Sequence, residues 1–125
     1  MSVETAIYSR AVAHAGLNAL IAGRIYPDVA PQEPTAPLVI YQQISTVPHH
    51  AMANTPRNTY RYQFDGYATT KTAAIALMVQ VVAAFNFFTD ATFAACLTDD
   101  GSSEVTELDQ IAQLYRSRID FMITA

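Results

Sequence analysis

The sequence predicts a small α+β domain, with a mainly antiparallel four-stranded sheet, two helices packed on one face and a long β-hairpin loop. Two segments, 3–22 and 73–85, carry apolar residues at helical spacing or around a whole helix. Two others, 58–68 and 115–125, alternate apolar and polar residues with the period of a strand. The order of helix, hairpin, helix and further strands is typical of helices segregated to one face of a sheet.

Length and composition predict a single domain over residues 1–125. A chain of 125 residues is close to the size of one ordinary domain with one hydrophobic core. Apolar residues make up 51% of the chain and charged residues only 14%. A protein that stays monomeric usually has a larger share of charged residues to cover its surface. We therefore expect part of the apolar surface to face a partner.

Charge and cysteine content narrow the function classes. The formal net charge is −4 and the basic residues are scattered, which argues against a protein that tracks nucleic-acid phosphates. Cys96 is the single cysteine, so it forms no internal disulfide. The sequence shows no secretion signal, and no apolar run is long enough to span a bilayer. We expect a soluble intracellular product with no membrane partner.

The N-terminal segment is predicted to be one helix followed by an extended connector. Gly23 stands where a C-cap glycine belongs. The apolar residues near one face of this helix are Val3, Ile7, Ala11, Leu17 and Ile21. Four prolines between Tyr26 and Pro37, without a periodic apolar pattern, predict the connector.

Two strands, 38–46 and 58–68, are predicted to pair as an antiparallel hairpin. The first is rich in β-branched and aromatic residues. On one face of the second lie Tyr60, Tyr62, Phe64 and Gly66. The connection, about 47–57, is longer than a tight turn, and loops of that length are often functional.

The second helix, 73–85, is apolar nearly all the way round, since only Gln80 is polar. Threonines before it offer N-caps. Such a helix must be covered on more than one side, and a neighbouring subunit is the natural candidate. Ile75, Val79 and Val82 are therefore candidate assembly contacts.

The remaining residues predict strands over 93–97 and 115–125, with a turn at 99–102. Residues 105–108 are a candidate for a further strand. Five acids between 99 and 109 do not have the spacing of an EF-hand loop, so we interpret them as a solvated acidic turn.

No catalytic or metal-binding constellation is found in the sequence. His49 and His50 are consecutive, so on a strand they would point to opposite faces rather than toward one metal ion. Cys96 lies within FAACL, where a structural thiol is inert. The four glycines are far apart, which excludes a phosphate-binding loop. We expect no enzyme activity, no cofactor and no metal.

Residues 47–57 are interpreted as the exposed tip of the hairpin. Prolines stiffen its two ends, while Met52 beside the histidines offers an adaptable, partly apolar surface. The candidate assembly contacts of this loop are His49, His50, Met52 and Arg57. These side chains suit contact rather than chemistry, and we expect the loop to touch a neighbouring subunit.

Five segments together resemble a known protein family. In order they read NALIAGRIYPDVAP, PLVIYQQIS, YRYQFDGYA, AAIALMVQVVAAF and YRSRIDFMI. The chain from about Leu17 onward is similar to the tail completion, or tail terminator, family of long-tailed bacteriophages. The shared features are apolar and turn patterns rather than catalytic signatures, and residues 90–112 depart most from them.

The resemblance implies a non-enzymatic structural protein of the virion. Members form a ring, expected to be a hexamer, that caps the head-proximal end of the tail tube, stops tube polymerisation and joins tail to head. The implied partners are copies of this chain, the tail tube protein and a head completion or stopper protein. The implied location is the head–tail junction, after assembly in the cytoplasm of the bacterial host. Genomic DNA would pass through the lumen without specific binding.

Two alternatives remain open from the sequence. One is another head–tail connector or minor tail protein on a similar fold. The other is a small ligand-binding or catalytic α+β domain that uses Tyr60, Tyr62 and His49 as a polar pocket.

Overall fold

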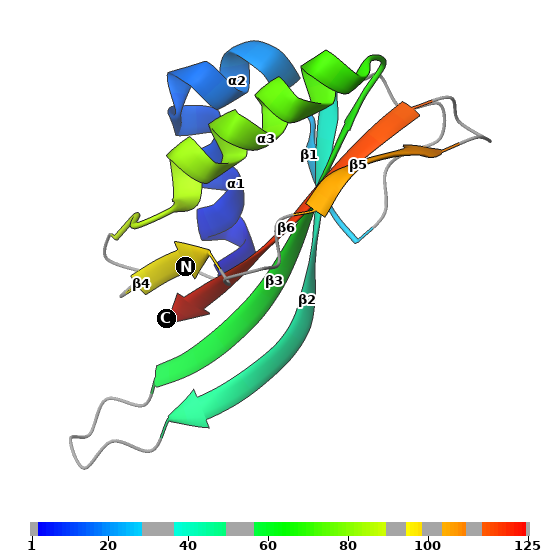
Figure 1. The fold of residues 1–125 in the computed structure, drawn as a ribbon. Helices are drawn as coiled ribbons and strands as arrows, with labels where there is room; N and C mark the ends of the chain where they lie inside the picture. Colours follow the sequence, from blue (N-terminus) through cyan, green and yellow to red (C-terminus); the bar gives the residue numbers. More distant parts are fainter. Residues whose placement is uncertain are drawn as a thin grey trace.

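A computed structural model describes residues 3–28, 37–49, 57–89, 95–98, 104–109 and 114–124. Its elements are α1 (Val3–Ala13), α2 (Ala15–Ile21), β1 (Ile25–Pro27), β2 (Leu38–His49), β3 (Arg57–Ala68), α3 (Lys71–Phe85), β4 (Ala95–Thr98), β5 (Glu104–Asp109) and β6 (Leu114–Thr124). The strands form one sheet in the order β1-β2-β3-β6-β4, with β5 also paired to β6. The three helices lie on one side of it (Figure 1). The predicted α+β class is confirmed, and every strand pair except β1–β2 is antiparallel.

The predicted first helix is broken at His14, which corrects the expectation of one helix over 3–22. His14 has an extended backbone, with φ −82° and ψ 107°. The break lets α2 turn toward α3, where a Cβ on Gly16 would collide with the Gln80 side chain. The N-terminal region therefore buries Ile7 from α1 and Leu17 from α2 in the same core.

The predicted proline-rich connector begins with a strand, which is a second correction. β1 pairs in parallel with β2, with Ile25 opposite Val39 and Pro27 opposite Tyr41. Pro27 is tolerated because β1 lies at the edge of the sheet, where its missing amide donor interrupts no hydrogen bonds to another strand. Residues 29–36 of the predicted connector lie outside the described residues.

The β2–β3 hairpin is confirmed and is longer than predicted. Its register continues to the pair of His49 with Arg57, which leaves only 50–56 as the connection. These seven residues lie outside the described part of the chain. The register shifts between Gln43 and Ser45, which marks a β-bulge at Ile44.

The C-terminal strands are also present. β4 overlaps the predicted 93–97, β5 confirms the candidate strand at 105–108, and β6 confirms the final strand. The predicted turn at 99–102 is not among the described residues. With β1 and β5, the sheet has two strands beyond the four predicted.

The core is centred on aromatic side chains beneath α3. The ring centroids of Phe64 and Phe85 are 5.0 Å apart, and those of Phe64 and Phe121 are 5.3 Å apart. Both pairs have the edge-to-face geometry that aromatic rings prefer. Gly66 lies under the same helix, since a Cβ there would meet Leu77 Cδ2 at 2.9 Å. Thr70 begins α3 by accepting a hydrogen bond from the Ala73 amide at 3.1 Å.

Truncating the central aromatic side chain tests this account of the core. Phe64→Ala should lower the free energy of unfolding by about 3–5 kcal/mol, because the ring is fully buried and its loss leaves a cavity. Urea denaturation followed by circular dichroism would measure the change. Tyr8→Ala is the control, since Tyr8 on α1 is 46% exposed and its truncation should shift stability by no more than about 0.5 kcal/mol. Equal losses in the two variants would contradict this core.

Candidate assembly surfaces

An apolar ridge runs along the outer side of α3. The helix buries Leu77 and Val81 against the sheet, whereas Ile75 is 50% and Val79 57% exposed. Ala83, about one helical turn after Val79, is also exposed. We call Ile75, Val79 and Ala83 the α3 ridge. Of the three contacts predicted on this helix, Val82 is partly buried and packs against the core instead.

The distal part of the hairpin is a second exposed surface. We call residues 43–49 and 57–60 the hairpin arm, which extends beyond the helices (Figure 1). Ile44 is 46% and Val47 52% exposed. His49 and Arg57, predicted contacts, pair at the end of the two strands. His50 and Met52 lie outside the described residues.

Phe87 is a third exposed apolar feature, which sequence reasoning missed. It follows the end of α3, is 76% exposed and has φ +64°. Its amide donates a hydrogen bond to the Cys96 carbonyl in β4 at 2.7 Å. The neighbouring Phe88 packs against the core beneath Arg10, whose guanidinium carbon lies 4.2 Å from the ring centroid. The sequence NFF signals the helix end but not which phenylalanine points outward.

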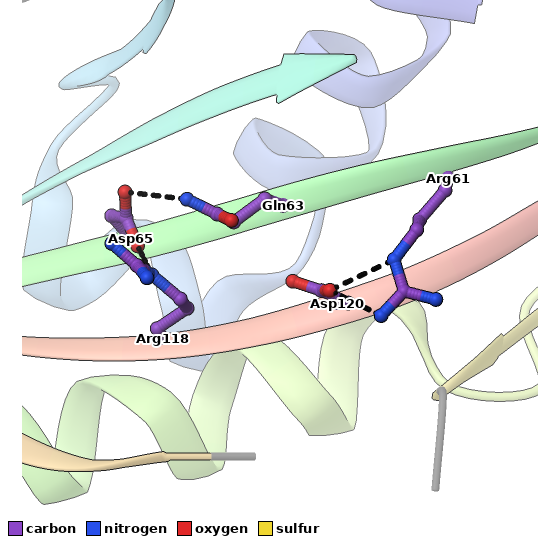
Figure 2. A network of polar contacts seen from close by, with 5 residues as sticks. All are labelled: Arg61, Gln63, Asp65, Arg118 and Asp120. Atoms are coloured by element: carbon purple, nitrogen blue, oxygen red, sulfur yellow. Dashed lines mark hydrogen bonds and ion pairs between the residues drawn. The ribbon is translucent and has the colours of Figure 1, made fainter. Parts of the chain in front are cut away.

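The middle of the sheet face opposite the core carries two ion pairs, as Figure 2 shows. Arg61 donates through Nε and Nη2 to Asp120 Oδ2, at 3.0 Å and 2.7 Å. Arg118 Nε donates to Asp65 Oδ1 at 3.0 Å, and Gln63 donates to the other oxygen of Asp65 at 3.3 Å. The arginine side chains are 32% exposed and the carboxylates 13%. These pairs leave the face with hydrogen-bonding capacity but little unbalanced charge.

The other described arginine contacts are also internal. Arg10 Nε donates to the Ala84 carbonyl at 2.7 Å, at the C-terminal end of α3. Arg24 donates to the carbonyls of Pro37 and Leu20, at 3.0 Å and 3.4 Å. Positive side chains near helix C-termini interact favourably with the helix dipole. These contacts hold two cations to the backbone of the protein itself.

The geometry does not support the alternative polar pocket. Tyr62 pairs with Gln43, whereas His49 pairs with Arg57 at the far end of the hairpin. At about 3.3 Å per residue, the five steps from Arg57 to Tyr62 span roughly 17 Å. Tyr62 itself is buried, and its burial, followed by the charge of Glu4, raises its pKa to about 12. The phenol therefore stays neutral and is no general base near neutral pH.

Across the described residues, His, Cys, Asp and Glu do not form a group of three that could hold a metal ion. No helix in the same part of the chain has the length and apolar character needed to cross a membrane.

Cys96 is a buried core residue rather than a reactive one. Its side chain is fully buried and belongs to the main hydrophobic cluster. Burial raises the pKa of its thiol to about 12. Because the thiolate is the nucleophile, this thiol is inert in the folded protein, as the sequence predicted.

Comparisons with known proteins agree with this architecture. Residues 5–125 match a family model described as tail completion protein gp17. Among solved structures, 16 chains match, including one from the "Virion of native gene transfer agent (GTA) particle". That chain is 16% identical, with a TM-score of 0.70 over 98% of this chain and 93% of its own length. At this identity the likeness shows a shared fold. No curated protein sequence matches.

Thiol labelling tests the burial of Cys96. The native protein should react with a thiol reagent at pH 8 far more slowly than the urea-unfolded chain, because only the unfolded thiol ionises near its usual pKa of 9.0. For the same reason the unfolded state loses its proton first as pH rises, so this group should lower stability above about pH 9. The rate of labelling is measured from the absorbance of the group that the reagent releases when it reacts with a thiol. A Ser9→Cys variant, exposed on α1, is the control for reactivity; native Cys96 reacting as fast as Cys introduced there would contradict the burial.

Proposed function

The chain belongs to the family of tail completion protein gp17, structural proteins of bacteriophage tails, and on that premise we propose that it acts as a tail terminator. Residues 1–125 form a single tail-terminator-like domain, and six copies assemble as a ring. The ring caps the head-proximal end of the tail tube, stops tube polymerisation and presents a surface for the head completion or stopper protein. It is a non-enzymatic component of the head–tail junction that is assembled in the host cytoplasm.

The observation that carries this proposal is the uncovered α3 ridge. Residues 72–89 contain no charged side chain, yet Ile75 and Val79 are about half exposed. Interface cores are depleted of charge in the same way. A second protein surface that covers the ridge would give α3 the cover that its all-round apolar sequence requires.

A ring requires two different surfaces on each subunit. Head-to-tail contacts are heterologous, since one patch of a subunit meets a different patch of the next. The α3 ridge and the hairpin arm are such a pair, because they belong to different elements and both expose apolar side chains. They therefore suit a head-to-tail contact, as a ring requires, rather than a two-fold dimer.

The hairpin loop contributes contacts at the rim of this assembly. His49 ends β2 and Arg57 begins β3, so the loop that joins the two strands starts and finishes at this end of the hairpin arm. His50 and Met52 in that loop then contact the next subunit, the tail tube or the lumen. Met52 suits such a role because its flexible side chain adapts to an irregular surface.

The charge distribution suits passage of DNA without retention. Six copies would carry a formal charge of −24, six times the −4 of one chain. Four of the arginines donate to carboxylates or carbonyls of the same chain. Phosphate binding requires cations that are available to replace counterions. A structure of the assembled ring with Arg57, Arg61, Arg116 and Arg118 lining the bore would contradict this part of the proposal.

Placing charge on the α3 ridge tests the proposed assembly. The wild-type chain should form a species several times heavier than its 13.7 kDa monomer, in solution or on tail tubes. The double variant Ile75→Glu/Val79→Glu should remain folded but monomeric, because burying two carboxylates at an interface carries a large desolvation penalty. Size-exclusion chromatography with light scattering measures both masses.

The matched control puts the same two charges, at the same spacing, on α1. Ser9→Glu/Ala13→Glu changes two exposed residues and should assemble as the wild type does. A wild-type chain that stays monomeric at high concentration and does not bind tail tubes would overturn the ring assignment.

Shortening the hairpin loop tests its role separately. Replacing residues 50–56 with Asn-Gly should leave the domain folded, because that dipeptide forms the two-residue turn that antiparallel strands favour. Its thermal midpoint should stay within a few degrees of the wild-type value, while assembly or attachment to the tail tube weakens. Light scattering and co-sedimentation with tail tubes measure the effect. Unchanged assembly would show that the loop makes no essential contact.

A further inference from the structure

Phe87 combines backbone strain with an exposed aromatic ring. A left-handed conformation is rare for a bulky residue and favours glycine, yet Phe87 has φ +64° and is 76% exposed. Its ring therefore gains little from burial within its own chain. Strained residues persist where the surroundings hold them and are concentrated at functional sites.

Its hydrogen bond places Phe87 at one edge of the sheet. The Phe87 amide donates to Cys96 of β4, the strand that follows β6 in the sheet order. Cys96 pairs with Ile123, which pairs with Tyr60, which in turn pairs with Thr46 of β2. Phe87 thus lies beside the same cross-strand row as Thr46, at the opposite side of the sheet.

Near the other end of that row, two apolar side chains of β2 are exposed. Ile44 and Val47 lie within two residues of Thr46 and are each about half exposed. β1 pairs with β2 only from Val39 to Tyr41, so among the described strands none covers this part of the β2 edge. Residues 38–48 contain no charged side chain.

We propose that Phe87 of one copy packs against Ile44 and Val47 of the next copy in the ring. Phe87 lies at one edge of the sheet, and Ile44 and Val47 lie at the opposite edge, at the same level along the strands. A side-by-side repeat of the chain therefore brings one onto the other without inverting either copy, as a heterologous contact demands. Both groups lie in uncharged segments, so neither has to bury a charge.

This contact makes Phe87 the anchor at the end of the α3 ridge. Aromatic side chains that fill an apolar site contribute disproportionately to binding. The hydrogen bond to Cys96 fixes the backbone of Phe87 before binding, which reduces the ordering required on association. The inference rests on the proposed self-assembly but specifies which edges meet.

Complementary variants test the pairing directly. Phe87→Asp removes the aromatic anchor, and Val47→Asp places a charge at the β2 edge that it would contact. Both variants should fold, because aspartate tolerates the left-handed backbone at 87 and the exposed strand position at 47. Each variant alone should be monomeric by light scattering. An equimolar mixture should give a 1:1 heterodimer that grows no further, because one intact Phe87 and one intact Val47 edge remain to meet.

Glycine variants separate this role from a structural one. Phe87→Gly should lose assembly and yet melt a few degrees above the monomeric Phe87→Asp variant, because glycine relieves the left-handed strain. Ala22→Gly is the matched control: Ala22 is exposed with φ +49°, so the variant should gain stability and assemble normally. Circular dichroism measures the midpoints and light scattering the masses.

The outcomes distinguish this inference from the proposed function. If the wild type assembles and Phe87→Asp or Phe87→Gly assembles equally well, the edge contact is wrong and the ring remains supported. An assembling wild type whose two aspartate variants, once mixed, stay monomeric would also contradict the contact. If the wild type neither assembles nor binds tail tubes, the proposed function fails together with this inference.

Discussion

The packing of α3 against the middle of the sheet is the contact on which the other features depend. Phe64, Phe85 and Phe121 meet there, and Gly66 allows Leu77 to come close to β3. Once these residues are buried, Ile75 and Val79 must point outward, because they lie on the other side of the same helix. The helix end is set by the same packing, and it places Phe87 beside β4. The core thus orients the surfaces proposed for assembly.

Apolar and charged side chains are separated around this core. Among the described residues, the large exposed apolar side chains lie on α3, after its end and on the hairpin arm, apart from Tyr8 on α1. The sheet face opposite the core carries the Arg61–Asp120 and Arg118–Asp65 pairs instead. Partly exposed pairs of this kind contribute little to stability. Their consequence for the proposed ring is a polar face whose cations are already matched to carboxylates.

The alternation of side chains predicted most of the fold because it follows burial directly. Tyr62, Phe64 and Gly66 are buried as their period-two spacing indicated, and α3 extends the predicted helix by two residues to Lys71. The break at His14 and the pairing of Ile25 with Val39 were missed, since both depend on contacts between distant segments. Ile75 and Val79 could be proposed from composition. Phe87 could not, because its left-handed backbone is stabilised by a hydrogen bond to Cys96.

The central claim is that this chain forms the ring at the head-proximal end of the tail. Electron cryomicroscopy of intact particles, with the chain fitted into the map, tests it most directly. We expect a ring of six copies between the tail tube and the head, with helix α3 of each copy against its neighbour. Finding the chain only elsewhere in the particle would contradict the account, as would copies at the junction whose α3 ridges contact no other protein.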